Sequence, residues 1–171
     1  MKRKVGIRSA AICAVFSALT VVLLFFGTLL DIIDITVAAA SSLITVIVLR
    51  ETGKRYSLLM FLASSVLAFL FMSSSSAVIY YISFFGYYPI VKEYINKLSK
   101  FFSTLLSYTV FNIIMLIDYL LFKSIFGISD EPLWMYLVLL IVSNIFFSAY
   151  NYALPVFSLL YEKKFRKIFR F

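Results

Sequence analysis

The chain has 171 residues, of which 63% are hydrophobic and only 14% are charged. A soluble domain has closer to half apolar and about a quarter charged residues, so this composition indicates an integral membrane protein. The formal net charge is +8. Because the basic residues flank apolar stretches and form no soluble patch, they suit anionic lipid headgroups rather than nucleic acid.

Residues 1–171 are predicted to form a single membrane domain that contains six apolar stretches. They span approximately residues 9–30, 35–49, 56–72, 77–91, 101–122 and 133–160. About 20 apolar residues are needed to cross the hydrocarbon core as a helix, so we predict an all-α bundle of six transmembrane helices. The fourth stretch is the weakest, because it is short and contains Gly86 and Pro89. Tilt, a kink, or continuation into the amphipathic segment 92–100 would let it cross.

The distribution of basic residues predicts the orientation of this bundle. When the six stretches are threaded through a bilayer in order, 15 of the 16 lysines and arginines fall on one side, and only Lys123 falls on the other. Cytoplasmic loops collect Lys and Arg. We therefore expect a multi-pass protein of the cell membrane with both termini in the cytoplasm. The basic and aromatic tail 162–171 is expected either to lie on the inner leaflet or to form a solvated anchor.

The sequence lacks the side chains on which most enzymes depend. It contains no histidine, and Cys13, its one cysteine, lies within the first apolar stretch, which leaves no disulfide framework and no thiolate metal site. It has no glycine-rich phosphate loop and no hydrolase motif. Asp31 and Asp34 are spaced like a carboxylate pair, but acidic residues are ordinary in a membrane turn. We expect no catalytic residue, no metal, no cofactor and no enzymatic activity.

Polar residues recur on one face of each of the last two predicted helices. The polar and tyrosine positions are Thr104, Tyr108, Asn112 and Tyr119 on the fifth, Tyr136, Asn144, Ser148 and Asn151 on the sixth, and Tyr80, Tyr81, Tyr87 and Tyr88 on the fourth. One interpretation is hydrogen bonding between helices, at about 0.6 kcal/mol per bond in a membrane. The other is a polar, aromatic-lined pocket that opens outward between these helices. Its candidate substrate-binding residues are Asn144, Asp118, Tyr136, Tyr80, Tyr81 and Asn112.

Asp118 is the most unusual residue of the chain, because it places a carboxylate inside the fifth stretch, about one turn from its outer end. A carboxylate at depth costs a few kcal/mol and faces a cavity or a partner. We weigh two roles equally. Asp118 either contacts a ligand, or it is a structural anchor that reaches the interface or pairs with Lys123.

The first stretch carries Ala10, Ala14 and Ala18, a small residue at every fourth position. Such a ladder forms a smooth groove that lets a second helix approach closely. Together with the length, the six stretches and the cytoplasmic termini, this ladder resembles the bacterial substrate-binding S component of an energy-coupling factor (ECF) transporter. In that family an alanine motif on the first helix docks against the transmembrane T component.

The resemblance implies a membrane subunit that binds a small molecule such as a vitamin near the outer surface. Transport would be driven by two cytoplasmic ATPases coupled through the T component. Asn144, Asp118, Tyr80 and Tyr136 fall where the family places its ligand. Two alternatives stay open. One is a non-transporting membrane scaffold of the MreD type, with the grooves used for protein contacts. The other is a small channel or lipid scramblase, with the polar stripes lining a continuous path.

Overall fold

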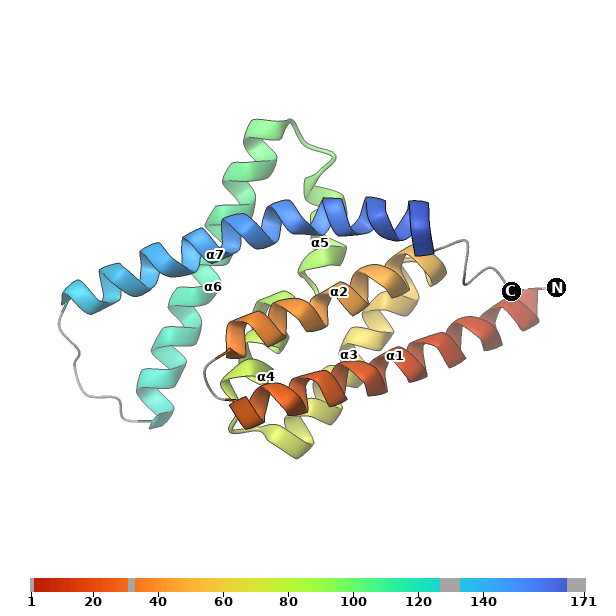
Figure 1. The fold of residues 1–171 in the computed structure, drawn as a ribbon, viewed down its shortest axis with the longest axis horizontal. Coiled ribbons are helices and arrows are strands. Elements are labelled where there is room, and N and C mark those ends of the chain that lie inside the picture. Colours follow the sequence, from red (N-terminus) through yellow and green to blue (C-terminus); the bar gives the residue numbers. More distant parts are fainter. Residues whose placement is uncertain (1, 31–32, 127–132, 166–171) are drawn as a thin grey trace.

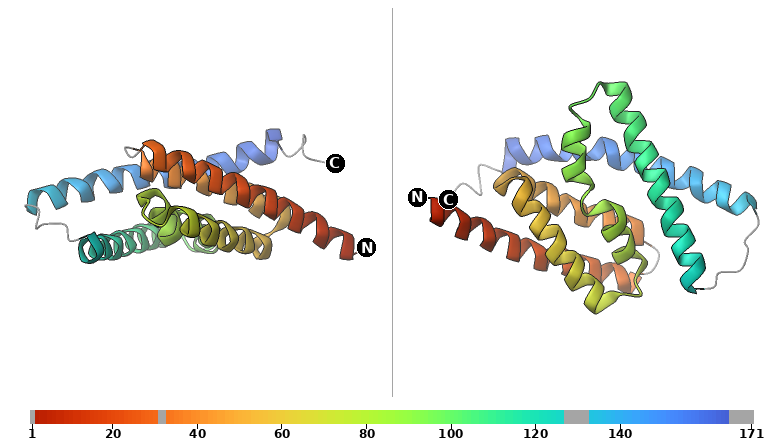
Figure 2. Two further views of the ribbon diagram at one scale, coloured as in Figure 1. Left: turned by 90° about the horizontal axis from the view of Figure 1, so that it is seen from below. Right: turned by 180° about the vertical axis from the view of Figure 1, so that it is seen from behind.

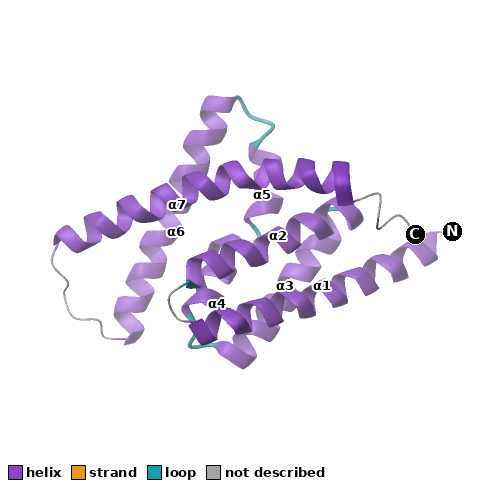
Figure 3. Ribbon diagram, viewed as in Figure 1, coloured by secondary structure: helices purple, strands orange, loops and turns teal. Residues whose placement is uncertain are grey.

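The computed structural model describes residues 2–30, 33–126 and 133–165, and every regular element in these ranges is a helix (Figure 3). Five of the described helices are long and apolar enough to cross a membrane. They are α1 (Lys2–Leu30), α2 (Asp34–Thr52), α3 (Lys54–Met72), α6 (Lys100–Phe126) and α7 (Leu133–Leu160). The predicted all-helical class is confirmed, and these helices match five of the six predicted stretches closely.

The fourth predicted stretch is a broken helix and not a continuous span. It consists of α4 (Ser76–Tyr80), a π-helical turn (Tyr81–Phe85) and α5 (Tyr88–Ile95). The amide of Gly86 donates to the carbonyl oxygen of Tyr81 at 2.7 Å, which is the five-residue bond of a π-helix. Pro89 has no amide hydrogen, but it lies in the first turn of α5, where no donor is required.

The helices pack in two layers (Figures 1 and 2). α1, α2 and α3 contact one another extensively, and α7 lies along the opposite side of α2. The broken helix α4–α5 packs behind α2, and α6 lies next to it in the rear layer (Figure 2). α6 crosses behind α7 obliquely, so these two long helices meet over a short length.

Aromatic rings form the centre of the bundle where the broken helix meets α6 and α7. Phe84 and Tyr88 are fully buried, and both contact the ring of Phe147 from α7. Phe111 of α6 stacks on Phe147 with ring centroids 4.3 Å apart. Aromatic contacts of this kind stabilise a core beyond the area that they bury.

The outer surface of the long helices is apolar. Leu, Ile, Val and Phe side chains are exposed along α1, α3, α6 and α7, among them Leu70, Phe71, Leu116 and Ile145. A soluble protein rarely exposes a continuous apolar surface of this extent. The exterior of the described part of the chain therefore suits a lipid environment.

Candidate functional site

Asp118 lies at the contact between α6 and the broken helix. Its carboxylate is 3% exposed and accepts a hydrogen bond of 2.7 Å from the hydroxyl of Ser83. The Tyr87 hydroxyl donates to the Ser83 carbonyl oxygen at 2.6 Å. Because α6 continues to Phe126, Asp118 is about two helical turns from the end of its helix. The carboxylate is buried against protein, at the contact with Ser83.

The two neighbouring tyrosines of the broken helix have different surroundings. Tyr80 is half-buried and within electrostatic range of Asp118. Tyr81 is fully buried, and its hydroxyl lies 2.9 Å from the hydroxyl of Ser64 on α3. Of the predicted site residues, the structure therefore brings Tyr80 and Asp118 together and directs Tyr81 toward α3. The polar groups around Asp118 are defined here as the Asp118 cluster: Asp118, Ser83, Tyr80 and Tyr87.

Asn112 and Asn144 bind each other where α6 crosses α7. The amide nitrogen of Asn144 donates to the side-chain oxygen of Asn112 at 2.9 Å, and the amide nitrogen of Asn112 donates to the side-chain oxygen of Asn144 at 3.0 Å. Tyr108 and Ser148 share a further hydrogen bond between the same helices. These polar stripes therefore hold helix to helix in this structure. Tyr136, the remaining predicted site residue, has a side chain outside the described part.

The alanine ladder of α1 faces away from the bundle. Ala10, Ala14 and Ala18 are all exposed. The buried face of the same helix carries Cys13 and Ser17, whose side chains donate to the carbonyl oxygens of Tyr56 and Met60 on α3 at 3.2 and 3.3 Å. Helix α1 thus has one set of small residues packed inside the bundle and a second set that no described helix covers.

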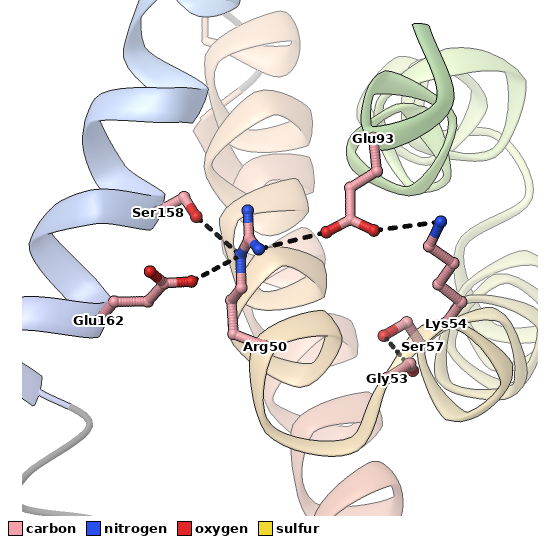
Figure 4. A network of polar contacts seen from close by, with 7 residues as sticks. All are labelled: Arg50, Gly53, Lys54, Ser57, Glu93, Ser158 and Glu162. Atoms are coloured by element: carbon pink, nitrogen blue, oxygen red, sulfur yellow. Dashed lines mark hydrogen bonds and ion pairs between the residues drawn. The ribbon is translucent and has the colours of Figure 1, made fainter. Parts of the chain in front are cut away.

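An ionic network joins α2, α3, α5, α7 and the π-helical segment Tyr161–Phe165 that follows α7 (Figure 4). The Arg50 guanidinium lies 3.3 Å from a Glu93 carboxylate oxygen and 3.4 Å from one of Glu162, and it donates to the Ser158 hydroxyl at 2.8 Å. Lys54 lies 3.4 Å from the other oxygen of Glu93. Sequence reasoning missed this network. The available signal was the presence of two isolated glutamates within otherwise basic segments.

A cavity of about 260 Å³ lies beside this network, between α2, α5 and α7. Its apolar wall comes mainly from α2 and α7, and its polar groups are Arg50, Lys92, Glu93, Asn96, Ser158 and Glu162. It lies at the end of the bundle that carries the basic connections, and no residue of the Asp118 cluster lines it. The sequence predicted a pocket that opens outward between the last three spans. This cavity lies elsewhere, so the sequence did not predict it.

Across the described residues, no group of three or more His, Cys, Asp or Glu side chains is arranged to hold a metal ion. Comparison of the chain with protein-family models, curated proteins and solved structures gave no match.

Proposed function

We propose that this protein is a non-enzymatic, small-molecule-binding subunit of a cell-membrane importer, and that it docks on a transmembrane partner through α1. In this proposal the chain crosses the membrane six times, with the broken helix as the fourth span and both termini in the cytoplasm. The partner corresponds to the T component of an ECF transporter, coupled to two cytoplasmic ATPases.

The observation that carries the proposal is the exposed alanine ladder. Ala10, Ala14 and Ala18 are exposed along one side of α1, next to the face whose Cys13 and Ser17 contact α3. Leu, Ile and Phe dominate the other exposed surfaces, and they suit lipid. A strip of small side chains instead allows close backbone approach by another helix, so a transmembrane protein is the better occupant for it.

The arrangement of the basic connections supports the proposed orientation. The start of α3 contacts α1 through Tyr56, and it contacts α5 through the Lys54–Glu93 ion pair. Glu162, two residues after the end of α7, reaches the same place. Basic connections that are distant in sequence thus gather at one end of the bundle, as the positive-inside rule requires of a cytoplasmic end.

The Asp118 cluster is the proposed ligand-contacting region at the opposite end. A buried carboxylate is costly in a membrane, and Asp118 is bound to Ser83 of the π-helical turn. Buried carboxylates and π-helical turns often mark ligand and ion sites. Asp118→Asn keeps an acceptor for Ser83 but removes the negative charge. If the ligand is cationic, this variant lowers its affinity without unfolding the protein.

Replacement of Ala14 by Trp tests the docking proposal. The indole would separate two helices that meet at backbone contact distance, so we expect loss of partner co-purification while the protein remains folded. Ala63→Trp is the matched control, because Ala63 is an exposed alanine of α3. Partner retention by Ala14→Trp at the level of Ala63→Trp would refute docking through the ladder.

A non-transporting scaffold is the second candidate, and the Asn112–Asn144 pair favours it. These two amides satisfy each other, so that part of the polar stripe has a structural use that needs no ligand. Native mass spectrometry of gently purified protein separates the two candidates. A co-purifying small molecule supports the importer subunit, whereas a membrane protein partner without any small molecule supports the scaffold.

A further inference from the structure

We propose that the cavity between α2, α5 and α7 binds the phosphate group of an anionic phospholipid, with Lys92 as its principal cation. This site is separate from the Asp118 cluster and from the alanine ladder. The proposal does not depend on transport, because it concerns only the basic end of the bundle.

Lys92 is a buried cation whose hydrogen-bond partner is neutral. The side chain is only 8% exposed, and its ammonium group donates to the Ser107 hydroxyl of α6 at 2.9 Å. The ammonium group also lies 6.0 Å from the centroid of the Tyr88 ring, which is a distant contact. A buried charge is costly unless it is paired, and a hydroxyl and a distant ring do not neutralise an ammonium ion.

The carboxylates nearest to the cavity already have cationic partners. Glu93 is shared by Arg50 and Lys54, and Glu162 pairs with Arg50. The cavity and its ionic network thus contain three cations and two carboxylates, which leaves one positive charge in excess. Glu51 accepts a hydrogen bond from Tyr161 and is not among the cavity-lining residues. An anion beside Lys92 would neutralise the excess charge.

The shape and lining of the cavity favour a phospholipid over a free anion. Besides its polar groups, the cavity has an apolar wall that includes Leu154, Pro155 and Leu159. Leu159 is 56% exposed on the outside of α7, so the apolar wall continues onto a surface that suits acyl chains. Basic groups at the membrane boundary attract anionic headgroups, and a phosphate oxygen accepts charge-assisted hydrogen bonds from lysine.

Lys92→Met tests the site directly, because it removes the charge and keeps an unbranched apolar side chain. Lys97→Met is the matched control, since Lys97 is an exposed lysine two residues beyond the end of α5. Each protein is titrated with phosphatidylglycerol in neutral-lipid nanodiscs, and bound lipid is followed by native mass spectrometry. Wild type and Lys97→Met are expected to retain one phosphatidylglycerol, and Lys92→Met to bind it at least about tenfold more weakly.

The shift in melting temperature on adding phosphatidylglycerol is a second test. A lysine with only a structural role would not affect that shift. Phosphatidylglycerol is expected to raise the melting temperature of wild type and Lys97→Met but not that of Lys92→Met. Lys92→Met should fold in neutral lipid, because no carboxylate loses its partner. If it does not fold, Lys92→Arg replaces it and is expected to retain lipid binding.

Competition by soluble inorganic phosphate and by glycerol 3-phosphate tests whether the bound anion is a lipid headgroup or a soluble anion. Binding of phosphatidylglycerol with no competition from either soluble anion supports the lipid site. Equal affinity for inorganic phosphate would overturn the lipid assignment in favour of a soluble anion. Equal phosphatidylglycerol affinity in wild type and Lys92→Met, or loss of phosphatidylglycerol binding in a folded Lys92→Arg variant, would overturn the proposal.

Discussion

Replacing Asn144 by Leu is expected to destabilise the α6–α7 crossing. The substitution removes two hydrogen bonds, of 2.9 and 3.0 Å, that join Asn144 to Asn112. At about 0.6 kcal/mol per bond in a membrane, the coupling between the two amides is about 1.2 kcal/mol. Asn112→Leu breaks the same two bonds. Each single variant also leaves the partner amide without its reciprocal contact, so each is expected to cost about 1–3 kcal/mol.

A double-mutant cycle isolates that coupling. The free energy of unfolding is measured by SDS titration in mixed micelles for wild type, both single variants and the double variant. Because the bonds are lost only once, the double variant should be less destabilised than the sum of the single variants by about 1.2 kcal/mol. Ser143→Ala is the control. Ser143 is the preceding residue on α7, and its hydroxyl bonds back to the Leu140 carbonyl oxygen of its own helix.

Additive single effects would refute the reasoning, because they would mean that the two amides do not stabilise each other. The same preparations distinguish a ligand role. If Asn144→Leu retains its stability but loses a co-purifying small molecule, Asn144 acts on the ligand, as the sequence predicted. If stability falls while the bound fraction per folded molecule is unchanged, Asn144 acts only between helices.

Three further predictions follow from the backbone and the topology. Gly53→Ala is expected to cost about 1–3 kcal/mol of unfolding free energy, because Gly53 has φ +86° in open space and this conformation is strained for any other residue; unchanged stability in an SDS titration would contradict it. Gly86→Ala is expected to cost about 1–3 kcal/mol, because its Cβ would lie 2.5 Å from the Phe61 ring, and Phe61→Leu in the same chain should recover part of that loss. In cysteine variants with Cys13 removed, an impermeant reagent on intact cells should label position 74 and not position 99, and the reverse pattern would exclude the proposed orientation.

The sequence predicted the positions of most of the helices because hydrophobic length is a local property. The stretch 133–160 coincides with α7, and the stretch 101–122 lies within α6. The fourth stretch was the weakest candidate for a membrane span, and in the structure its helix is broken. Gly86 and Pro89 lie at the junction where the π-helical turn gives way to α5. From the sequence we expected tilt, a kink or an extension to complete a fourth span, and the structure has a π-helical turn there, with Gly86 close to the Phe61 ring.

The candidate site was less accessible to sequence reasoning, because it depends on which helices meet. Spacing placed Asn112 and Asn144 on polar faces, but both the pocket and the interhelical bond were compatible with that spacing. The structure pairs them across the α6–α7 crossing. Asp118 was singled out by its charge within an apolar stretch, whereas its partner Ser83 comes from a segment 35 residues earlier in the chain.

The sequence by itself predicted a membrane protein, the ranges of the five long helices and the asymmetry of the basic residues, since each follows from composition and order along one chain. Only the tertiary structure decided which face of α1 is exposed, because it buries Cys13 against α3 and leaves the adjacent Ala14 exposed. It also decided that Lys92 is buried beside a cavity, because that environment is built by helices that are distant in sequence. Burial and pairing arise from long-range packing, which local patterns do not specify.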